Sequence, residues 1–349
     1  MMKSTFDTKD CIYLLKDLTG IAPYTSFEEK EKMIAEGRNY SEMITEESPL
    51  SDDICQIFEQ MLQDKAADLA QYVASVGEQM YARGQRNCII VSLARAGSPV
   101  GAIVKRYIHY KYGVDVPHYS ISIIRDKGID ENALDYIRRQ HPSGIITFLD
   151  AWTGKGSITR ELQKAICEYN DKNGTNLSAD LAVLADPAHL SAIAGTRKDV
   201  CIPNACLNST ISGLVSRTIL NKTYIGQGDF HGAVRFDRLR SQDVTNHFLD
   251  VVEYYFPYIK THEVLSPANS CVDLIIERLR QDFPVANIHK VKLSIGESSR
   301  ALIRRKPYKV LIKNPQNPDL SFVLHLARVK GVEICIYDTM NYECITLLK

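Results

Sequence analysis

The chain alternates short apolar runs with longer amphipathic stretches. The runs lie at 88–94, 117–124, 145–149, 181–185 and 200–203. Each is too short for a helix, and most are apolar on both faces, which is typical of buried strands in a parallel sheet. Asp150 is expected to end the strand that begins at residue 145.

Helical spacing of apolar residues fills the intervals between these runs. Between Ile158 and Ile166 the apolar side chains recur every three or four residues. Similar spacing predicts helices at 52–80, at 131–140, near 242–255, at 271–282, and from the 95–101 loop to about Tyr112. Strands and helices that take turns predict an α/β fold, in which helices flank a parallel sheet.

A chain of 349 residues should hold more than one hydrophobic core. We expect an N-terminal cap at 1–50, a main domain at 51–265, a linker helix at 266–285 and a small domain at 286–349. The last is expected to run β, α, β, α, β, β. Its strands are placed at 291–294, 309–313, 332–337 and 344–348, and its helices at 296–305 and 319–330.

Composition indicates an ordinary cytoplasmic protein. The nine cysteines are scattered without CxxC pairs, which favours free thiols in a reducing compartment over disulfides or a zinc site. No run of eighteen apolar residues is present, and the first residues lack the apolar core of a signal peptide. A membrane partner is therefore not expected, and a homodimer is left open.

Charge is divided unevenly along the chain. Residues 286–349 carry eleven Lys and Arg against five Asp and Glu, although the whole chain is neutral. A compact basic domain favours nucleic acid as a partner. Arg300, Arg304, Arg305 and Lys306 cluster on or beside one predicted helix, and we expect them to contact RNA phosphates.

A glycine-rich loop joins the 145–149 strand to the helix after it. Thr153, Gly154, Lys155, Gly156 and Ser157 supply backbone N–H groups, hydroxyls and a positive charge at a helix N-terminus. This combination predicts a phosphate site. It is not a Walker A loop, because Gly156 separates Lys155 from Ser157.

The same stretch resembles the ribose-phosphate loop of type I phosphoribosyltransferases, and residues 93–97 resemble their pyrophosphate loop. The resemblance implies that Asp150 contacts the ribose and Mg²⁺, with Leu149 where a second acid is usual. It further implies that the backbone around Ala94, Arg95, Ala96 and Gly97 receives pyrophosphate.

Two further segments complete the expected site. Arg125 and Asp126 lie where these enzymes carry a mobile hood over the reaction, although a plain charged turn is the alternative. Five polar residues later in the chain are expected to form a wall that selects the substrate. They are Asn208, Ser209, Thr210, Asp229 and His231. The alternative is that Asn208, Ser209 and Thr210 only cap a helix.

Several motifs together resemble the StiP family, which occurs with tellurium-resistance stress operons. They are Gly37–Met43, Ser92–Pro99, His118–Asp126, Trp152–Gly156, Leu207–Arg217 and Asp229–Gly232. Gly296–Arg305 resembles the Pelota-type RNA-binding domain, related in fold to L7Ae-like proteins. The resemblance implies a type I phosphoribosyltransferase-like domain followed by a Pelota-like domain.

The function expected from this resemblance is a phosphoribosyltransferase. It would handle phosphoribosyl pyrophosphate or a nucleoside-like ribose phosphate, with Mg²⁺, and would be coupled to RNA binding in a tellurite or stress response. One alternative is a nucleotide-sensing, RNA-binding module without turnover, which the absent acid at Leu149 favours. Another is a cysteine protease that uses Cys206 and His231, since some family members carry that label.

Overall fold

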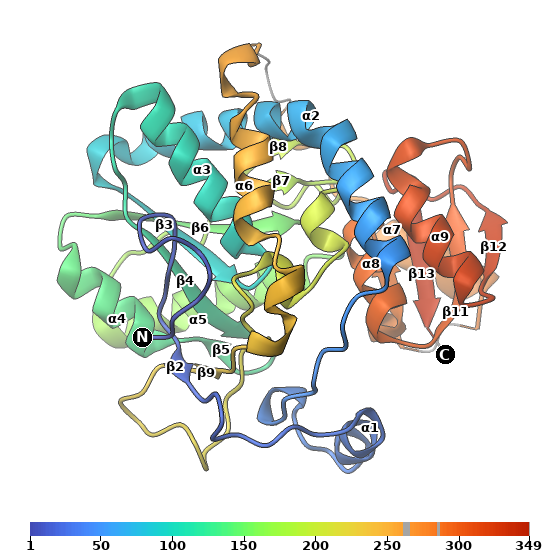
Figure 1. Cartoon of the computed structure of the whole chain (residues 1–349), viewed down its shortest axis with the longest axis horizontal. Coiled ribbons are helices and arrows are strands. Elements are labelled where there is room, and N and C mark those ends of the chain that lie inside the picture. The colour runs from blue at the N-terminus through green and yellow to red at the C-terminus, as the bar shows by residue number, and fades with distance from the viewer. Residues whose placement is uncertain (261–265, 285–286, 349) are drawn as a thin grey trace.

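The computed structural model describes residues 1–260, 266–284 and 287–348. A large α/β unit holds most of the chain, and a smaller unit at the C-terminus packs against it (Figure 1). The predicted mixed α/β architecture, with a parallel sheet flanked by helices and a small C-terminal domain, is confirmed. The predicted boundaries at residues 265 and 285–286 fall outside the described residues.

The main sheet has the strand order β1-β4-β3-β6-β7-β8, with all these neighbours parallel, and β5 pairs antiparallel with β4. The strands are β1 (Ile12–Tyr13), β3 (Cys88–Ala94), β4 (His118–Ile124), β5 (Gly128–Ile129), β6 (Ile145–Trp152), β7 (Leu181–Ala185) and β8 (Ile193–Thr196). A separate pair joins β2 (Lys16–Asp17) to β9 (Gly232–Ala233). Thus two segments of the predicted N-terminal cap take part in sheet pairing.

Two strand predictions were wrong. Asp150 does not end β6, which continues to Trp152, because Asp150 still pairs with Val183 of β7. No strand forms at 200–203; the last strand of the sheet is β8 instead. Pro203 lacks the N–H that a ladder needs and opens a 3-10 helix. In β8, Gly195 lets the strand pack closely, since an added Cβ would lie 2.6 Å from the Tyr72 Cβ.

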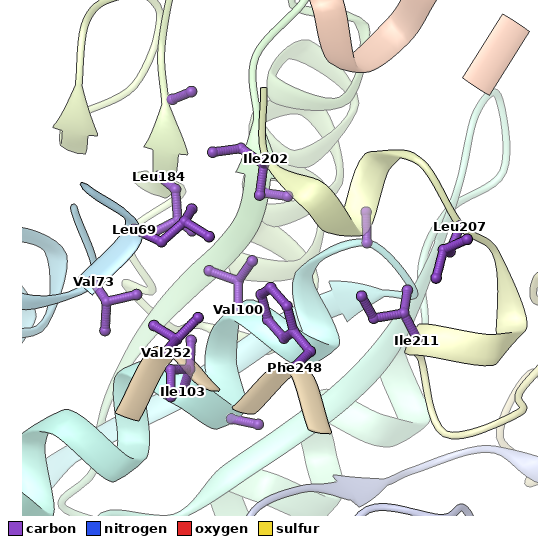
Figure 2. Close-up of a cluster of buried hydrophobic side chains, with 14 of the residues drawn as sticks. Leu69, Val73, Val100, Ile103, Leu184, Ile202, Leu207, Ile211, Phe248 and Val252 are labelled. Atoms are coloured by element: carbon purple, nitrogen blue, oxygen red, sulfur yellow. The ribbon is translucent and has the colours of Figure 1, made fainter. Parts of the chain in front are cut away.

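Helices cover both faces of the main sheet. One core lies under α2 (Asp52–Gly84), α3 (Gly97–Tyr112) and α6 (Thr245–Glu253), and the other under α4 (Glu131–Gln140) and α5 (Ser157–Asn173). Figure 2 shows side chains of the first core, where Val100 and Ile103 of α3 meet Leu69 of α2 and Phe248 of α6. None of the helices that the structure describes is long and apolar enough to cross a bilayer.

Shorter elements connect these parts. They are α1 (Phe27–Ala35) and the 3-10 helices η1 (Tyr40–Glu42), η2 (Gln85–Asn87), η3 (Pro203–Ala205), η4 (Ser209–Ile211), η5 (Asp237–Gln242), η6 (Phe256–Tyr258), η7 (Ile288–Lys290) and η8 (Pro318–Leu320).

The C-terminal unit is a four-stranded sheet in the order β10-β13-β11-β12 with helices against it. Its elements are β10 (Val291–Leu293), α8 (Ile295–Arg304), β11 (Pro307–Ile312), α9 (Ser321–Val329), β12 (Glu333–Ile336) and β13 (Cys344–Leu348). This is the predicted order. Helix α7 (Val272–Asp282) lies within the predicted linker, and its buried face packs with this sheet in one core.

Candidate functional site

A cleft of about 300 Å³ lies where the C-terminal unit meets the carboxyl end of β6. The main domain contributes Asp150, the loop after β6 and the start of α5, together with Ala96 and Arg125. The C-terminal unit contributes Lys292 and one face of α8. Carboxyl ends of parallel strands are where α/β proteins bind ligands, so this position favours a binding site.

Helix α5 begins at the wall of this cleft. Gly156 precedes it with φ of 77°, a left-handed conformation that glycine adopts without strain, and no side chain caps the helix. The first N–H groups of a helix have no partner within the helix, and the helix dipole is positive there. The start of α5 therefore suits an anion.

Helix α8 lies against Trp152 at the end of β6. Gly296 allows this approach, because an added Cβ would lie 2.4 Å from the Trp152 ring. One turn further along α8, the Arg300 guanidinium lies 4.8 Å from the centroid of the same ring. The two domains thus share one wall of the cleft.

Several residues of the cleft lining have buried polar atoms without a hydrogen-bond partner. These atoms are Nε and Nη2 of Arg300, Nε of Arg125 and Oε2 of Glu297. Burial, together with the charge of nearby Arg95, lowers the pKa of Arg300 to about 10. Unpaired donors on buried arginines are costly, since each loses hydration without replacement. An anionic ligand would supply acceptors for the two arginines, whereas Glu297 Oε2 needs a donor.

Asp150 is the carboxylate at the end of β6. Burial raises its pKa to about 6, although the Ala151 N–H (2.8 Å) and the charge of Arg300 lower it. Near neutral pH this carboxyl is therefore close to its titration point. Mg²⁺ at Asp150 stays a prediction; within the described ranges, no group of three or more His, Cys, Asp or Glu is placed to hold a metal ion.

The predicted phosphate loop is only partly directed at the cleft. Thr153, Gly154, Gly156 and Ser157 line it, but Lys155 does not. The Lys155 Nζ donates to the carbonyls of Ile288 (2.9 Å) and Val291 (2.7 Å) in the C-terminal unit, and burial lowers its pKa to about 8. The sequence could not show this, because those carbonyls lie more than 130 residues away.

The predicted pyrophosphate loop lies close to the end of β6. An added Cβ on Gly97 would lie 2.4 Å from the Leu149 carbonyl, so glycine permits this packing. Ala96 lines the cleft, whereas Ala94 ends β3. Arg95 is buried and donates to the Val215 carbonyl (2.8 Å) and to Glu47 (2.5 Å). The structure therefore gives Arg95 protein partners, and the cleft lining does not include it.

The other predicted site residues are dispersed. Arg125 lines the cleft, whereas Asp126 lies in an exposed turn and its N–H donates to Glu161. Asp229 pairs with Lys16 at 2.6 Å, and neither residue lines the cleft. Outside the cleft lining, Asn208 accepts from Arg304, Ser209 donates to Glu47, and Thr210 is buried. His231 also lies outside the lining, so the five residues do not form the predicted wall of this cleft.

The predicted RNA-contacting residues run along the cleft from inside to outside. Arg300 is partly buried within it, and Arg304 and Arg305 line it with exposed side chains. Lys306 is exposed beyond the end of α8 and is not part of the lining. The sequence predicted these cations but not the partners of Arg300 across the cleft, Asp150 and Trp152, because the two segments are far apart in the chain.

Cys206 and His231 do not form a hydrogen bond. Cys206 is buried 4.0 Å from the Cys201 sulfur, and burial raises its pKa well above the usual range. His231 lies 2.9 Å from the Ser122 hydroxyl, and its N–H group on the backbone donates to Asp130. In the parts of the chain that the structure describes, no cysteine is hydrogen-bonded to a histidine.

Two family models match the chain, one over each of its two units. The model of a family described as "Tellurite-like stress resistance cysteine protease StiP" matches residues 4–253. The chain belongs to the StiP family. A "PELOTA RNA binding domain" matches residues 272–349, so the C-terminal unit, α7 included, is a Pelota RNA-binding domain.

A full-length relative leads to the same family. The chain is 30% identical to "Cysteine protease StiP" of Acinetobacter baylyi over 369 aligned positions, covering 99% of this chain and 94% of the relative. Among solved structures, a NifS-like protein from Rickettsia africae aligns with 97% of this chain and 93% of its own. Its TM-score of 0.21 and 14% identity are too low to support an argument.

These relatives correct the predicted activity. The phosphoribosyltransferase prediction was wrong, and with it the expected glycosyl transfer, because both the family model and the A. baylyi relative bear the name of a cysteine protease. Phosphoribosyl pyrophosphate as a partner is unsupported. The StiP and Pelota resemblances were correct.

Sequence reasoning missed Lys292, Glu297 and Trp152 as cleft residues. Trp152 and Glu297 lie within motifs that were recognised, and Lys292 lies shortly before one, but only docking of the two domains brings the three together. A tryptophan beside a glycine loop was the one available signal, since the chain has a single tryptophan.

Proposed function

We propose that this StiP-family protein binds RNA phosphates in the cleft between its two domains. The observation that carries the proposal is Arg300, whose Nε and Nη2 are buried at the cleft without an acceptor. The Pelota match to residues 272–349 supports RNA as the ligand class. A phosphate oxygen accepts such hydrogen bonds well, because guanidinium and phosphate pair strongly.

Different residues of the cleft lining offer different groups to an anionic ligand. The uncapped start of α5 offers backbone N–H groups, and Arg125 and Arg300 offer unpaired donors at its wall. Arg304 and Arg305 extend the positive charge to the mouth. Five cations of the lining face only two carboxylates, Asp150 and Glu297, so the cleft attracts polyanions.

The test is binding of a fluorescent single-stranded RNA, measured by anisotropy at two salt concentrations. Replacing Arg300 by Gln should weaken binding on the order of tenfold, since one charge-assisted hydrogen bond contributes about 1.5–3 kcal/mol. The slope of the logarithm of the binding constant against the logarithm of the salt concentration should also become shallower by about one.

Arg328→Gln is the matched control. It removes the same charge from an exposed position of α9, outside the cleft lining. Its effect should stay below about twofold, in keeping with a general field effect. Equal losses in both variants would mean that RNA binds elsewhere on the basic domain.

A second candidate function is cysteine-dependent peptide hydrolysis. The name of the family and of the 30% identical relative favours it. A thiol protease needs a thiolate beside an imidazole. Cys206 is a poor candidate, because it is buried, its pKa is raised, and it has no imidazole partner among the residues that the structure describes.

Hydrolysis of an unstructured protein substrate, with and without iodoacetamide, tests this candidate. Activity that the alkylating agent abolishes supports it, and serine variants of the nine cysteines, made singly, then identify the nucleophile. Absence of hydrolysis, or hydrolysis that survives alkylation, counts against it.

A further inference from the structure

Three sulfur atoms lie together in the core of the main domain. The Cys201 Sγ is 4.0 Å from the Cys206 Sγ and 4.0 Å from the Met61 Sδ. Met61 belongs to α2, and the two cysteines lie on either side of η3. We infer that two thiolates and one thioether bind a cuprous ion, Cu(I), at this place. Such binding does not depend on the RNA binding proposed above.

The spacing of the sulfurs suits an ion with three ligands. A first-row metal ion such as zinc lies about 2.3 Å from a thiolate sulfur. Two sulfurs 4.0 Å apart that are both bound at such a distance subtend an angle of about 120° at the ion. This is the angle of a trigonal site. The Met61 side chain has several rotatable bonds, so its sulfur can adjust to complete the triangle.

The chemistry of the ligands favours Cu(I) over zinc. Soft thiolate and thioether sulfurs select Cu(I), whereas structural zinc takes four thiolate, imidazole or carboxylate ligands. Within the part of the chain that the structure describes, no further His, Cys, Asp or Glu joins the two cysteines in a group that could hold a metal ion. The third ligand on offer is the Met61 thioether, which zinc sites do not use.

Burial and charge around the sulfurs fit an ion of low charge. Met61, Cys201 and Cys206 are each no more than 4% exposed, and an uncompensated charge is costly at such a place. Cu(I) with two thiolates carries one net negative charge. Burial and the neighbouring Cys201 raise the pKa of Cys206, whereas the positive charge of Arg300 lowers it. The same arginine charge can balance the copper complex.

A surface pocket of about 320 Å³ borders the segments that carry the sulfurs. Its lining includes Phe58, one turn before Met61 on α2, and Leu207, which follows Cys206. Cys55 also lines this pocket and is only partly buried. The pocket therefore offers an incoming ion a first soft ligand near the surface, next to the buried sulfurs.

The experiment titrates the full chain with Cu(I) under anaerobic, reducing conditions, in competition with a coloured cuprous chelator. The wild type should retain a single Cu(I), and X-ray absorption should show sulfur ligands at about 2.3 Å. Both thiols release a proton when the ion binds, so retention should fall as the pH is lowered. A wild-type chain that yields all its Cu(I) to the chelator overturns the inference.

Three variants locate the ion. Met61→Leu removes one sulfur and nearly conserves volume, so the fold should persist. Its affinity for Cu(I) should fall at least about tenfold, because losing even a partner outside the ligand shell costs roughly 10–100-fold. Cys201→Ala and Cys206→Ala should lose retention, with folding checked by circular dichroism. Retention at the wild-type level in Met61→Leu and in either cysteine variant would place the copper elsewhere and overturn the inference.

Cys88→Ala is the matched control. Cys88 is fully buried, and burial raises its pKa to about 12. It packs against Gly84 at the far end of α2, roughly 30 Å along the helix from Met61. This variant should keep its Cu(I). An equal loss in Cys88→Ala and Cys206→Ala would show that buried thiols in general hold the copper, and would contradict a three-sulfur site.

Discussion

Asp150 is the residue at which the cleft responds to pH. Burial raises its pKa to about 6, so it is mostly ionised at pH 7.5 and mostly protonated at pH 5.5. Its negative charge opposes a bound anion, and protonation removes that opposition. The pKa of a group with a neighbouring anion rises further, so ligand binding and proton uptake by Asp150 favour each other.

We therefore expect RNA binding to strengthen when the pH falls from 7.5 to 5.5. An RNA with hydroxyls at both ends is the suitable probe, because its phosphodiesters keep their charge in this range. Wild-type affinity should rise severalfold, and Asp150→Asn should bind more tightly at pH 7.5 and lose most of the pH dependence. Anisotropy titrations at the two pH values measure both.

His289 provides the internal control for this prediction. Burial and the charges of Arg125, Lys155 and Lys292 lower its pKa below that of an ordinary histidine. The contribution of His289 to the pH dependence of RNA binding should remain in Asp150→Asn. If RNA binding by Asp150→Asn depends on pH as it does in the wild type, a group other than Asp150 causes the pH dependence.

Helix α8 and strand β6 meet through a glycine and a tryptophan. Gly296 lies in the first turn of α8 with no room for a Cβ beside Trp152. Ser294 caps this helix by accepting from the Glu297 N–H at 3.3 Å. The close contact sets how far Arg300 reaches across the Trp152 ring, so one small residue positions the cationic face of the helix.

Gly296→Ala should lower the free energy of unfolding by about 1–3 kcal/mol, because overpacking a rigid aromatic contact forces the helix away. RNA binding should weaken with it, as Arg300 moves off Trp152. Chemical denaturation followed by Trp152 fluorescence reports both the stability and the environment of the single tryptophan.

Gly228→Ala is the comparison variant. No atom lies within 4 Å of a Cβ added at Gly228, so its stability should change by less than about 1 kcal/mol. A Gly296→Ala protein as stable as Gly228→Ala would show that α8 can shift without penalty.

Buried polar contacts join the two domains in addition to the apolar core that they share. Asp199 of the main domain accepts from the backbone N–H groups of Ile295 (3.1 Å) and Glu343 (2.9 Å) in the Pelota domain. It is 5% exposed. Replacing it by an apolar residue would leave two buried N–H groups without acceptors.

Asp199→Ala should therefore loosen the Pelota domain from the main domain. We expect faster amide hydrogen exchange at Ile295 and Glu343 than in the wild type, with little change in strands β3 and β6. The loss should correspond to about 1–3 kcal/mol for each orphaned N–H. Exchange measured by mass spectrometry resolves the peptides concerned.

Asp53→Ala tests whether any contact between the domains has this effect. Asp53 hydrogen-bonds His325 of the Pelota domain at 2.8 Å, but the Asp53 side chain is 50% exposed and that of His325 is 29% exposed. Exposed ion pairs contribute little, so exchange at Ile295 and Glu343 should stay as in the wild type. Similar acceleration in both variants would contradict a special role for Asp199.

Much of the fold could be predicted from local patterns. The run 88–94 is β3, and the periodicity of the Pelota domain predicted its element order. The failed strand at 200–203 shows the limit of that approach. An apolar run that ends in proline is compatible with a strand or a loop, and pairing with β7 selected 193–196 instead.

The sequence by itself determined most of the elements, the family and the glycine loop, because periodicity, turn residues and motifs are properties of neighbouring residues. Only the tertiary structure decided which groups the charged side chains contact. Lys155 lies in the glycine loop yet binds carbonyls of the other domain, and Arg300 lies over a ring 148 positions earlier. Such partners are chosen by domain packing, which brings together side chains that no local pattern connects.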